Sequence, residues 1–226
     1  LLATSGCAVN CRYCFRRHFA YGDNRISRKQ WAEALNYVAT DNSISEVILS
    51  GGDPLLLQDD ALQELVTLIE AIPHVRRLRI HSRLPVVIPQ RLTPALQSLL
   101  SNSRLQVSMV LHINHPTELS DALRLPLQAL RQSGITLLNQ AVLLRKVNNT
   151  LGILSDLSER LFEFGVLPYY LHLLDSVRGA HHFDISEQEA VFLYRQLLAE
   201  LPGYLVPRLV REEAGKANKS PINLDR

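Results

Sequence analysis

The chain has 226 residues, of which 46% are hydrophobic and 20% charged, a globular composition that argues against disorder. Its formal net charge of +2 gives no bulk attraction for nucleic acid or for an anionic membrane. No apolar run approaches the roughly 18 residues that a spanning helix needs, which excludes a membrane span. The sequence shows no secretory leader, so we expect a cytoplasmic protein.

Short β-rich runs alternate with helical segments along the chain. The runs predict strands at residues 1–5, 45–50, 76–82, 104–112, 135–142 and 166–173. From the second strand on, the starts lie about 28 to 31 residues apart, close to the roughly 30 residues of a βαβ unit. The order predicts a single α/β domain over residues 1–226 with a parallel sheet, either doubly wound or a partial barrel. In both architectures, ligands bind at the carboxyl ends of the strands.

Local signals place the ends of several helices. Ser27 with Gln30, and Ser186 with Glu189, fit the capping-box pattern that begins a helix. Pro126 lies inside a helical stretch and predicts a kink or a break there. The chain begins at Leu1 rather than at a methionine, so we expect it to be a fragment of a longer protein.

All three cysteines lie close together, at Cys7, Cys11 and Cys14. A disulfide framework normally has an even number of cysteines spread over the fold, so this cluster indicates a metal instead. Three thiolates on one loop can hold three irons of a [4Fe–4S] cluster and leave the fourth iron open to a small molecule. The alternative is a zinc site with His18 as fourth ligand, in a binding module without turnover.

A second motif, Ser50-Gly51-Gly52-Asp53, follows the predicted second strand. Glycines at such a place expose backbone polar groups and allow a ligand to approach closely. A plain turn between strand and helix is the alternative. By itself the motif is a weak signal of ligand binding.

The cysteine loop, with the aromatic Tyr13 before its last cysteine, resembles that of radical S-adenosylmethionine (SAM) enzymes. Further segments resemble the lysine 2,3-aminomutase family along essentially the whole chain: Cys-Arg-Tyr-Cys-Phe-Arg-Arg-His-Phe, Ser-Gly-Gly-Asp-Pro-Leu, His-Ser-Arg-Leu-Pro, His-Ile-Asn-His-Pro and Leu-Asn-Gln-Ala-Val-Leu-Leu-Arg. Within that family, the motifs are most similar to the branch that forms (R)-β-lysine for modification of elongation factor P. The catabolic branch, which forms (S)-β-lysine, is the alternative.

The resemblance implies a partial (β/α)6 barrel and an isomerase that moves the α-amino group of L-lysine to the β-carbon. It implies a [4Fe–4S] cluster and SAM as the source of an adenosyl radical, and pyridoxal 5′-phosphate as carrier of the migrating nitrogen. A radical enzyme that lacks pyridoxal phosphate is a further alternative. An electron donor such as flavodoxin or ferredoxin, and the enzymes of the elongation factor P pathway, would be its partners.

The resemblance also assigns roles to single residues. Lys219, within a C-terminal segment 204–226, matches the lysine that holds pyridoxal phosphate, with Lys216 as the rival. The cationic partners of the pyridoxal phosphate group are expected upstream of Leu1. Residues implied to lie at SAM are Gly51, Gly52, Asp53, Ser82 and Arg83, with His112 and Gln140 implied around its adenosyl group.

Substrate recognition needs a cation for the α-carboxylate and anions for the ε-ammonium group. Arg16 matches the arginine of the family that binds the carboxylate, and Asp175 matches an aspartate at the ε-amino end. Glu212 replaces a second such aspartate, and a surface salt bridge is its alternative role. The neighbouring Arg12, with Arg17 and Arg25, is expected to form a solvated basic face.

Overall fold

The structure is a computed structural model that describes residues 1–16, 26–213, 215–216 and 218–224. The chain forms two compact units. The first unit comprises Leu1–Val9, Phe19–Leu111 and Asp121–Leu137, and the second comprises Asn10–His18, His112–Ser120 and Leu138–Arg226. In the part of the chain that the structure describes, none of the helices combines the length and the apolar character needed to cross a membrane.

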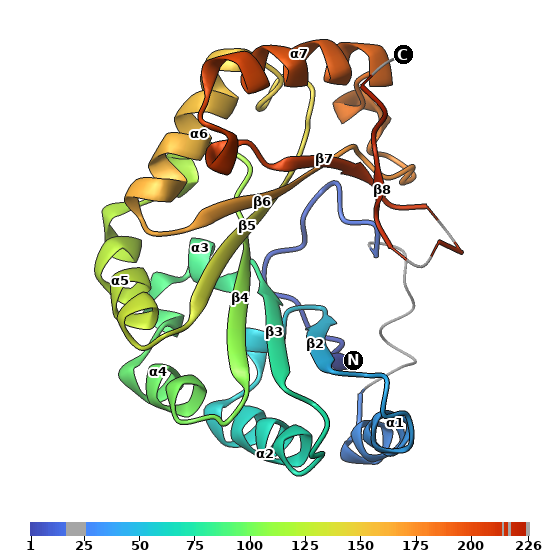
Figure 1. The fold of residues 1–226 in the computed structure, drawn as a ribbon, viewed down its shortest axis with the longest axis vertical. Helices are drawn as coiled ribbons and strands as arrows, with labels where there is room; N and C mark the ends of the chain where they lie inside the picture. Colours follow the sequence, from blue (N-terminus) through green and yellow to red (C-terminus); the bar gives the residue numbers. More distant parts are fainter. Residues whose placement is uncertain (17–25, 214, 217, 225–226) are drawn as a thin grey trace. The chain divides into compact units, whose positions relative to one another are not determined.

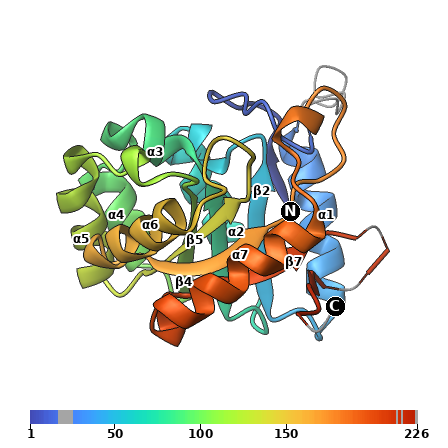
Figure 2. The ribbon, with the colours of Figure 1, turned by 90° about the horizontal axis from the view of Figure 1, so that it is seen from above.

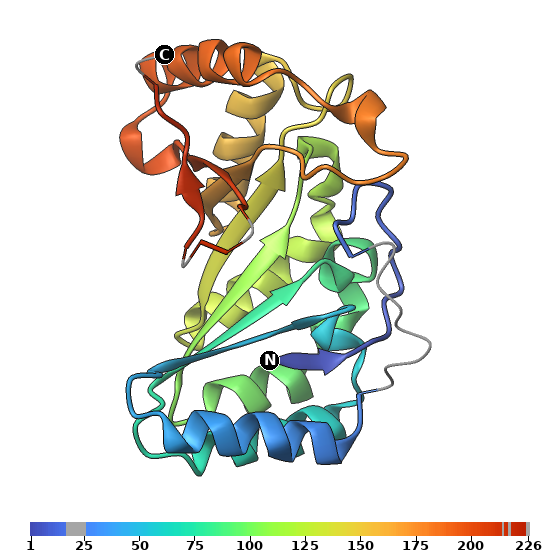
Figure 3. The same ribbon diagram turned by 90° about the vertical axis from the view of Figure 1, so that its right-hand side faces the viewer.

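The first unit is built on parallel strands. They are β1 (Leu2–Thr4), β2 (Glu46–Gly51), β3 (Arg77–Ser82) and β4 (Gln106–His112), each paired with the next; the last residue of β4 belongs to the second unit. Figure 3 shows β1 beside β2. Alternate residues of β2 and β3 are buried, as expected for strands covered by helices. Leu49, Ile80 and Met109 are fully buried at the centre of this unit.

The helices of the first unit are α1 (Arg28–Thr40), α2 (Asp59–Glu70), α3 (Leu84–Val87), α4 (Pro94–Ser101) and α5 (Arg124–Gln132), with short 3-10 turns η1 (Pro54–Leu56), η2 (Pro89–Arg91) and η4 (Asp121–Leu123). Helices α1, α2, α4 and α5 pack side by side in chain order (Figure 1). The predicted capping box of Ser27 and Gln30 begins α1.

The prediction of a kink or break at Pro126 is wrong. Helix α5 begins at Arg124, so Pro126 lies in its first turn. There a proline is tolerated, because an N–H group in the first turn has no carbonyl of the same α-helix to pair with. The turn η4 directly precedes α5 and accounts for the helical character upstream of the proline.

The second unit carries β5 (Thr136–Val142, whose first two residues belong to the first unit), β6 (Leu167–His172), β7 (Arg208–Arg211) and β8 (Ser220–Pro221). Strands β5, β6 and β7 are parallel, whereas β8 runs antiparallel to β7. Helices α6 (Leu151–Glu163) and α7 (Glu187–Glu200) pack against each other (Figure 2). Helix α7 begins with the predicted capping box of Ser186 and Glu189. Three 3-10 turns complete the unit: η3 (Pro116–Glu118), η5 (His181–Phe183) and η6 (Gly203–Leu205).

All six predicted strands are confirmed, with small differences at their ends. The hairpin of β7 and β8 was not predicted from the sequence. Its strands have four and two residues, too few to show an alternating pattern.

Candidate active site

The cysteine loop forms a tight turn at its second and third cysteines. The backbone N–H of Cys14 donates to the carbonyl oxygen of Cys11 at 3.1 Å, and Asn10 before it has a positive φ of 50°. Cys7 belongs to the first unit, whereas Cys11 and Cys14 belong to the second. All three cysteines are half-buried free thiols.

The two residues between the second and third cysteines are anchored to other segments of the second unit. The guanidinium of Arg12 lies 3.1 Å from Nε2 of His182 and 5.1 Å from the ring centre of Phe183. The hydroxyl of Tyr13 accepts a hydrogen bond from the side-chain amide of Asn114. Although Arg12 is exposed as expected, it holds the loop to η5 rather than facing only solvent.

Among the residues described, no three His, Cys, Asp or Glu side chains are gathered as a ready-made metal site. The donors nevertheless suit a soft metal centre, because three free thiols lie in one short loop and none forms a disulfide. The cluster role of the cysteines therefore stays a prediction that the chemistry of the thiols supports. Three residues named from the sequence, Arg17, His18 and Arg25, lie outside the described part of the chain.

The glycines after β2 allow a close approach between two segments of the protein. A Cβ on Gly51 would lie 2.3 Å from the carbonyl oxygen of Thr4, and one on Gly52 would lie 1.8 Å from that of Gly6. The N–H groups of Gly52 and Asp53 donate to these same two carbonyls, at 2.9 and 2.8 Å. Both N–H groups are thus used within the protein, so any SAM contact here depends on other atoms of the segment.

The carboxylate of Asp53 ties the loop after β2 to the loop after β3. One oxygen accepts from the hydroxyl of Ser82 at 2.6 Å and from the N–H of Leu55 at 3.1 Å. The other accepts from the N–H groups of Arg83 at 2.8 Å and Leu84 at 3.0 Å. With all its acceptor positions occupied in a buried place, the Asp53 side chain has a positioning role. Direct binding of SAM by this residue stays a prediction.

The two residues predicted at the adenosyl group, His112 and Gln140, both belong to the second unit. His112 ends β4, and Gln140 lies within β5. The side-chain oxygen of Gln140 is buried and has no hydrogen-bond partner among the described residues. A buried acceptor is costly unless a partner satisfies it. This oxygen therefore fits a place at a bound ligand.

His172 is a polar residue of this region to which the sequence assigned no role. It ends β6, is 8% exposed, and its Nε2 has no hydrogen-bond partner within the described residues. Burial, followed by the nearby charges of Lys219 and His112, lowers the pKa of His172 from 6.5 to about 3. The imidazole is therefore neutral at physiological pH.

The hairpin of β7 and β8 brings Glu212 and Lys219 together. The register pairs Val210 with Pro221 and Arg211 with Ser220, so the next pair outward is Glu212 and Lys219. The Nζ of Lys219 lies 2.9 Å from Oε2 of Glu212. Glu212 thus forms an ion pair, the alternative role that the sequence left open for it, and its binding of a substrate ammonium group stays a prediction.

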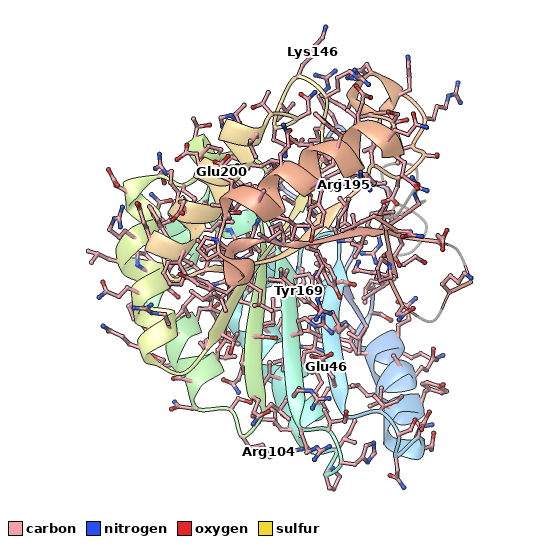
Figure 4. The ribbon with its side chains drawn as sticks, turned by 45° about the horizontal axis from the view of Figure 1, so that its top comes forward. Glu46, Arg104, Lys146, Tyr169, Arg195 and Glu200 are labelled. Atoms are coloured by element: carbon pink, nitrogen blue, oxygen red, sulfur yellow. The ribbon has the colours of Figure 1, made fainter. Side chains whose placement is uncertain are left out.

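The surroundings of Lys219 also include Asp175 and two tyrosines of β6. Burial, together with the charge of Glu212, raises the pKa of Asp175, while the charge of Lys219 opposes that shift. The Nζ of Lys219 lies 5.4 Å from the ring centre of Tyr170. The Tyr170 hydroxyl lies 3.1 Å from that of Tyr169, which is labelled in Figure 4. Lysine, two acids and aromatic rings therefore share one region.

Lys216 and Arg16 are two further residues to which the resemblance assigned a role. Lys216, the rival of Lys219, is exposed. The guanidinium of Arg16 lies 4.8 Å from the ring centre of the adjacent Phe15, and its contact with a substrate carboxylate stays a prediction. No role was assigned from the sequence to Tyr170 or to His172. The signal that could have found them is the alternation of β6, which places these two polar rings on the same side as each other.

Comparison with known families and relatives agrees with the family resemblance seen in the sequence. Residues 1–78 match the model of a family described as "4Fe-4S single cluster domain". The chain is 53% identical over 224 residues to an L-lysine 2,3-aminomutase of Escherichia coli (strain K12), covering 99% of this chain and 66% of that protein. It is 54% identical over 219 residues to an L-lysine 2,3-aminomutase of Haemophilus influenzae, covering 97% of this chain and 65% of that protein. The chain thus spans slightly less than two thirds of these relatives.

Solved structures share the fold. One is "Native anSMEcpe with bound AdoMet and Kp18Cys peptide", with a TM-score of 0.65, 15% identity, and coverage of 88% of this chain and 59% of that one. Another is a radical SAM methyltransferase from Sphaerobacter thermophilus, with a TM-score of 0.64, 15% identity, and coverage of 95% and 66%. These likenesses confirm the predicted fold class, an α/β partial barrel.

Proposed function

Because the chain belongs to the lysine 2,3-aminomutase family, we propose that it works as an isomerase converting L-α-lysine to β-lysine. We further propose the (R) product, made for modification of elongation factor P. The observation that carries the proposal is the meeting of Lys219, Glu212 and Asp175 around the β7–β8 hairpin. The reaction needs an amine that can hold an aldehyde cofactor, and it needs two acids that can bind an ammonium group.

When bound, the cluster and SAM supply a 5′-deoxyadenosyl radical, and pyridoxal phosphate supplies an aldehyde that carries the migrating amino group. Cys7, Cys11 and Cys14 hold the cluster through their thiolates. Asp53 and Ser82 hold the loops after β2 and β3 in place, through a hydrogen bond of 2.6 Å. We propose that the reaction takes place in the cytoplasm with flavodoxin or ferredoxin as electron donor, and three clustered cysteines that form no disulfide support a reducing compartment.

In the second unit, each proposed group has one task. Lys219 holds the pyridoxal cofactor between turnovers, and Arg16 binds the substrate carboxylate as a guanidinium fork. Asp175 and Glu212 bind the ε-ammonium group. The raised pKa of Asp175 means that an arriving cation stabilises its charged form, so that the pocket favours a positively charged side chain. Gln140, whose buried oxygen lacks a partner among the described residues, contacts the SAM adenosyl group.

The test uses the full-length protein, reconstituted anaerobically with iron, sulfide and pyridoxal phosphate. SAM, dithionite and L-lysine are added, and β-lysine is assayed on a chiral column. The (R) product supports the proposed branch, whereas the (S) product points to the catabolic branch. Deoxyadenosine without β-lysine would keep the radical chemistry and discard the substrate.

Two measurements separate the alternatives. Zinc without sulfide in the purified protein would favour a zinc-stabilised binding module. Absence of the visible absorption of an imine, in protein that still cleaves SAM, would favour a radical enzyme without pyridoxal phosphate.

A further inference from the structure

Three asparagines of the second unit form a buried hydrogen-bond network. Asn114, Asn139 and Asn148 are 3%, 2% and 0% exposed. A buried amide is costly unless its donors and acceptors are paired, and a well-paired network holds its members in one arrangement. These side chains are therefore placed to fix the backbone segments that they join.

Two of the three asparagines, Asn139 and Asn148, bind the segment after β4 and the turn after β5. Asn139 accepts from the N–H of Ile113 at 2.9 Å and donates to its carbonyl at 3.0 Å. Asn148 accepts from the N–H of Leu144 at 2.7 Å and donates to the carbonyl of Val142 at 2.9 Å. Together they fix the turn after β5 and the segment after β4.

Asn114 is the member that also reaches the cysteine loop. Its Oδ1 accepts from the N–H of Val142 at 2.8 Å, and its carbonyl accepts from the Asn148 amide at 2.8 Å. The side-chain amide nitrogen of Asn114, Nδ2, donates a hydrogen bond to the hydroxyl of Tyr13. One side chain thus joins the end of β5 to the residue that precedes the third cysteine.

We propose that Asn114 is a positioning residue of the cysteine loop. Through Tyr13 it fixes the turn between Cys11 and Cys14, because that turn cannot shift without breaking a half-buried hydrogen bond. His112, predicted at the adenosyl group, is only two residues from Asn114, so the same bond sets the turn relative to the end of β4. The inference rests on the proposed function in taking Cys11 and Cys14 as cluster ligands and SAM as a ligand of the cluster.

The experiment measures how fast a chelator removes iron from the reconstituted full-length protein under anaerobic conditions. Tyr13→Phe and Asn114→Ala each remove the bond from one end, and each should speed iron loss about tenfold, as expected for one hydrogen bond. The double variant should lose iron no faster than Asn114→Ala alone, because both changes remove the same interaction.

Asn148→Ala is the matched control, since it removes bonds of the same network but none to the cysteine loop. It should lower the melting temperature and leave the rate of iron loss within about twofold of wild type. If Tyr13→Phe loses iron at the wild-type rate, or if Asn148→Ala accelerates the loss as much as Asn114→Ala, the proposal is overturned.

A spectroscopic readout checks the same role without turnover. The electron paramagnetic resonance signal of the reduced cluster should respond to SAM in wild type, and Tyr13→Phe should need about tenfold more SAM for the same response. Wild-type protein that takes up no cluster would overturn both this inference and the proposed function. A cluster that forms normally, with all variants behaving like wild type, would overturn this inference alone.

Discussion

At Lys219, the side-chain amine is held between an acid and an aromatic ring. Its Nζ lies 2.9 Å from Glu212 and 5.4 Å from the ring centre of Tyr170, and the side chain is only 26% exposed. Lys216, by contrast, is exposed to solvent. A cofactor aldehyde needs an amine with a fixed position and limited access of water, which favours Lys219 over Lys216.

Lys219→Ala should abolish formation of β-lysine and the visible imine absorption, because no amine remains at this place to hold the aldehyde. Iron and sulfide content should stay at the wild-type level, because the change lies far along the chain from the cysteines. The matched control Lys216→Ala should retain activity within about twofold. Full activity in Lys219→Ala would refute the assignment.

His172 should make the protein sensitive to acid. Its pKa is about 3 in the folded chain, against an ordinary value of 6.5, so between these values the unfolded chain binds a proton that the folded chain does not. Stability is therefore lost as the pH falls through this window. Between pH 7 and pH 5 the loss from this residue should be about 2 kcal/mol in the free energy of unfolding.

The measurement is denaturant unfolding of wild type and His172→Leu at both pH values. The variant should lose about 2 kcal/mol less than wild type on acidification, whatever its stability at pH 7. His181→Leu, which removes an exposed histidine, should behave like wild type. Equal acid sensitivity in wild type and His172→Leu would contradict the predicted linkage.

At the scale of elements, the loops after the first three strands are fastened to one another rather than left free. Thr4 and Gly6 accept hydrogen bonds from the segment after β2, and Asp53 in turn binds the segment after β3. Loops at strand ends usually carry function, and function needs them held accurately. Here the fastening uses backbone carbonyls and one buried carboxylate.

Gly52→Ala should destabilise the first unit by at least about 3 kcal/mol, because the new Cβ would lie 1.8 Å from the carbonyl oxygen of Gly6 and the two loops would have to separate. Thermal unfolding measures this loss. The matched control is Gly152→Ala in α6, where a Cβ meets nothing within 4 Å, and it should be neutral or slightly stabilising. Equal melting temperatures for the two variants would show that the loops do not pack this closely.

For the whole molecule, regular elements could be predicted from the sequence because their signals are local. The strands β2 to β6 are β-rich runs, and the capping boxes of α1 and α7 use neighbouring residues. The cysteine loop was recognised from the clustering and odd number of its cysteines, whereas Lys219 was found only by resemblance to a family. Their contacts could not be predicted, because Tyr13 with Asn114 and Lys219 with Tyr170 are pairs far apart in the chain.

The prediction made for Asp53 also shows what a short sequence motif cannot determine. The sequence indicated a residue at a ligand, because it follows two glycines at a strand end. The structure instead gives its side chain four protein donors, among them Ser82 and the backbone of Arg83. Nothing in a short motif distinguishes a carboxylate that faces a ligand from one that holds two loops together.

Removal of the cluster should lower the stability of the whole protein. A group that binds the folded chain through three thiolates, and the unfolded chain only weakly, shifts the equilibrium toward folding. The anaerobically reconstituted protein should therefore melt at a higher temperature than the same protein after chelation. A variant with all three cysteines changed to alanine should melt at the same temperature with and without the chelator.

In the short hairpin of β7 and β8, the pairing register of the two strands decides where Lys219 lies. Val210 pairs with Pro221 and Arg211 with Ser220, and this register alone sets Lys219 opposite Glu212. A slip of this register by one residue would turn Lys219 to the other face of the hairpin, because successive side chains alternate. The pairing of β7 with β8 therefore decides whether the lysine lies beside Glu212.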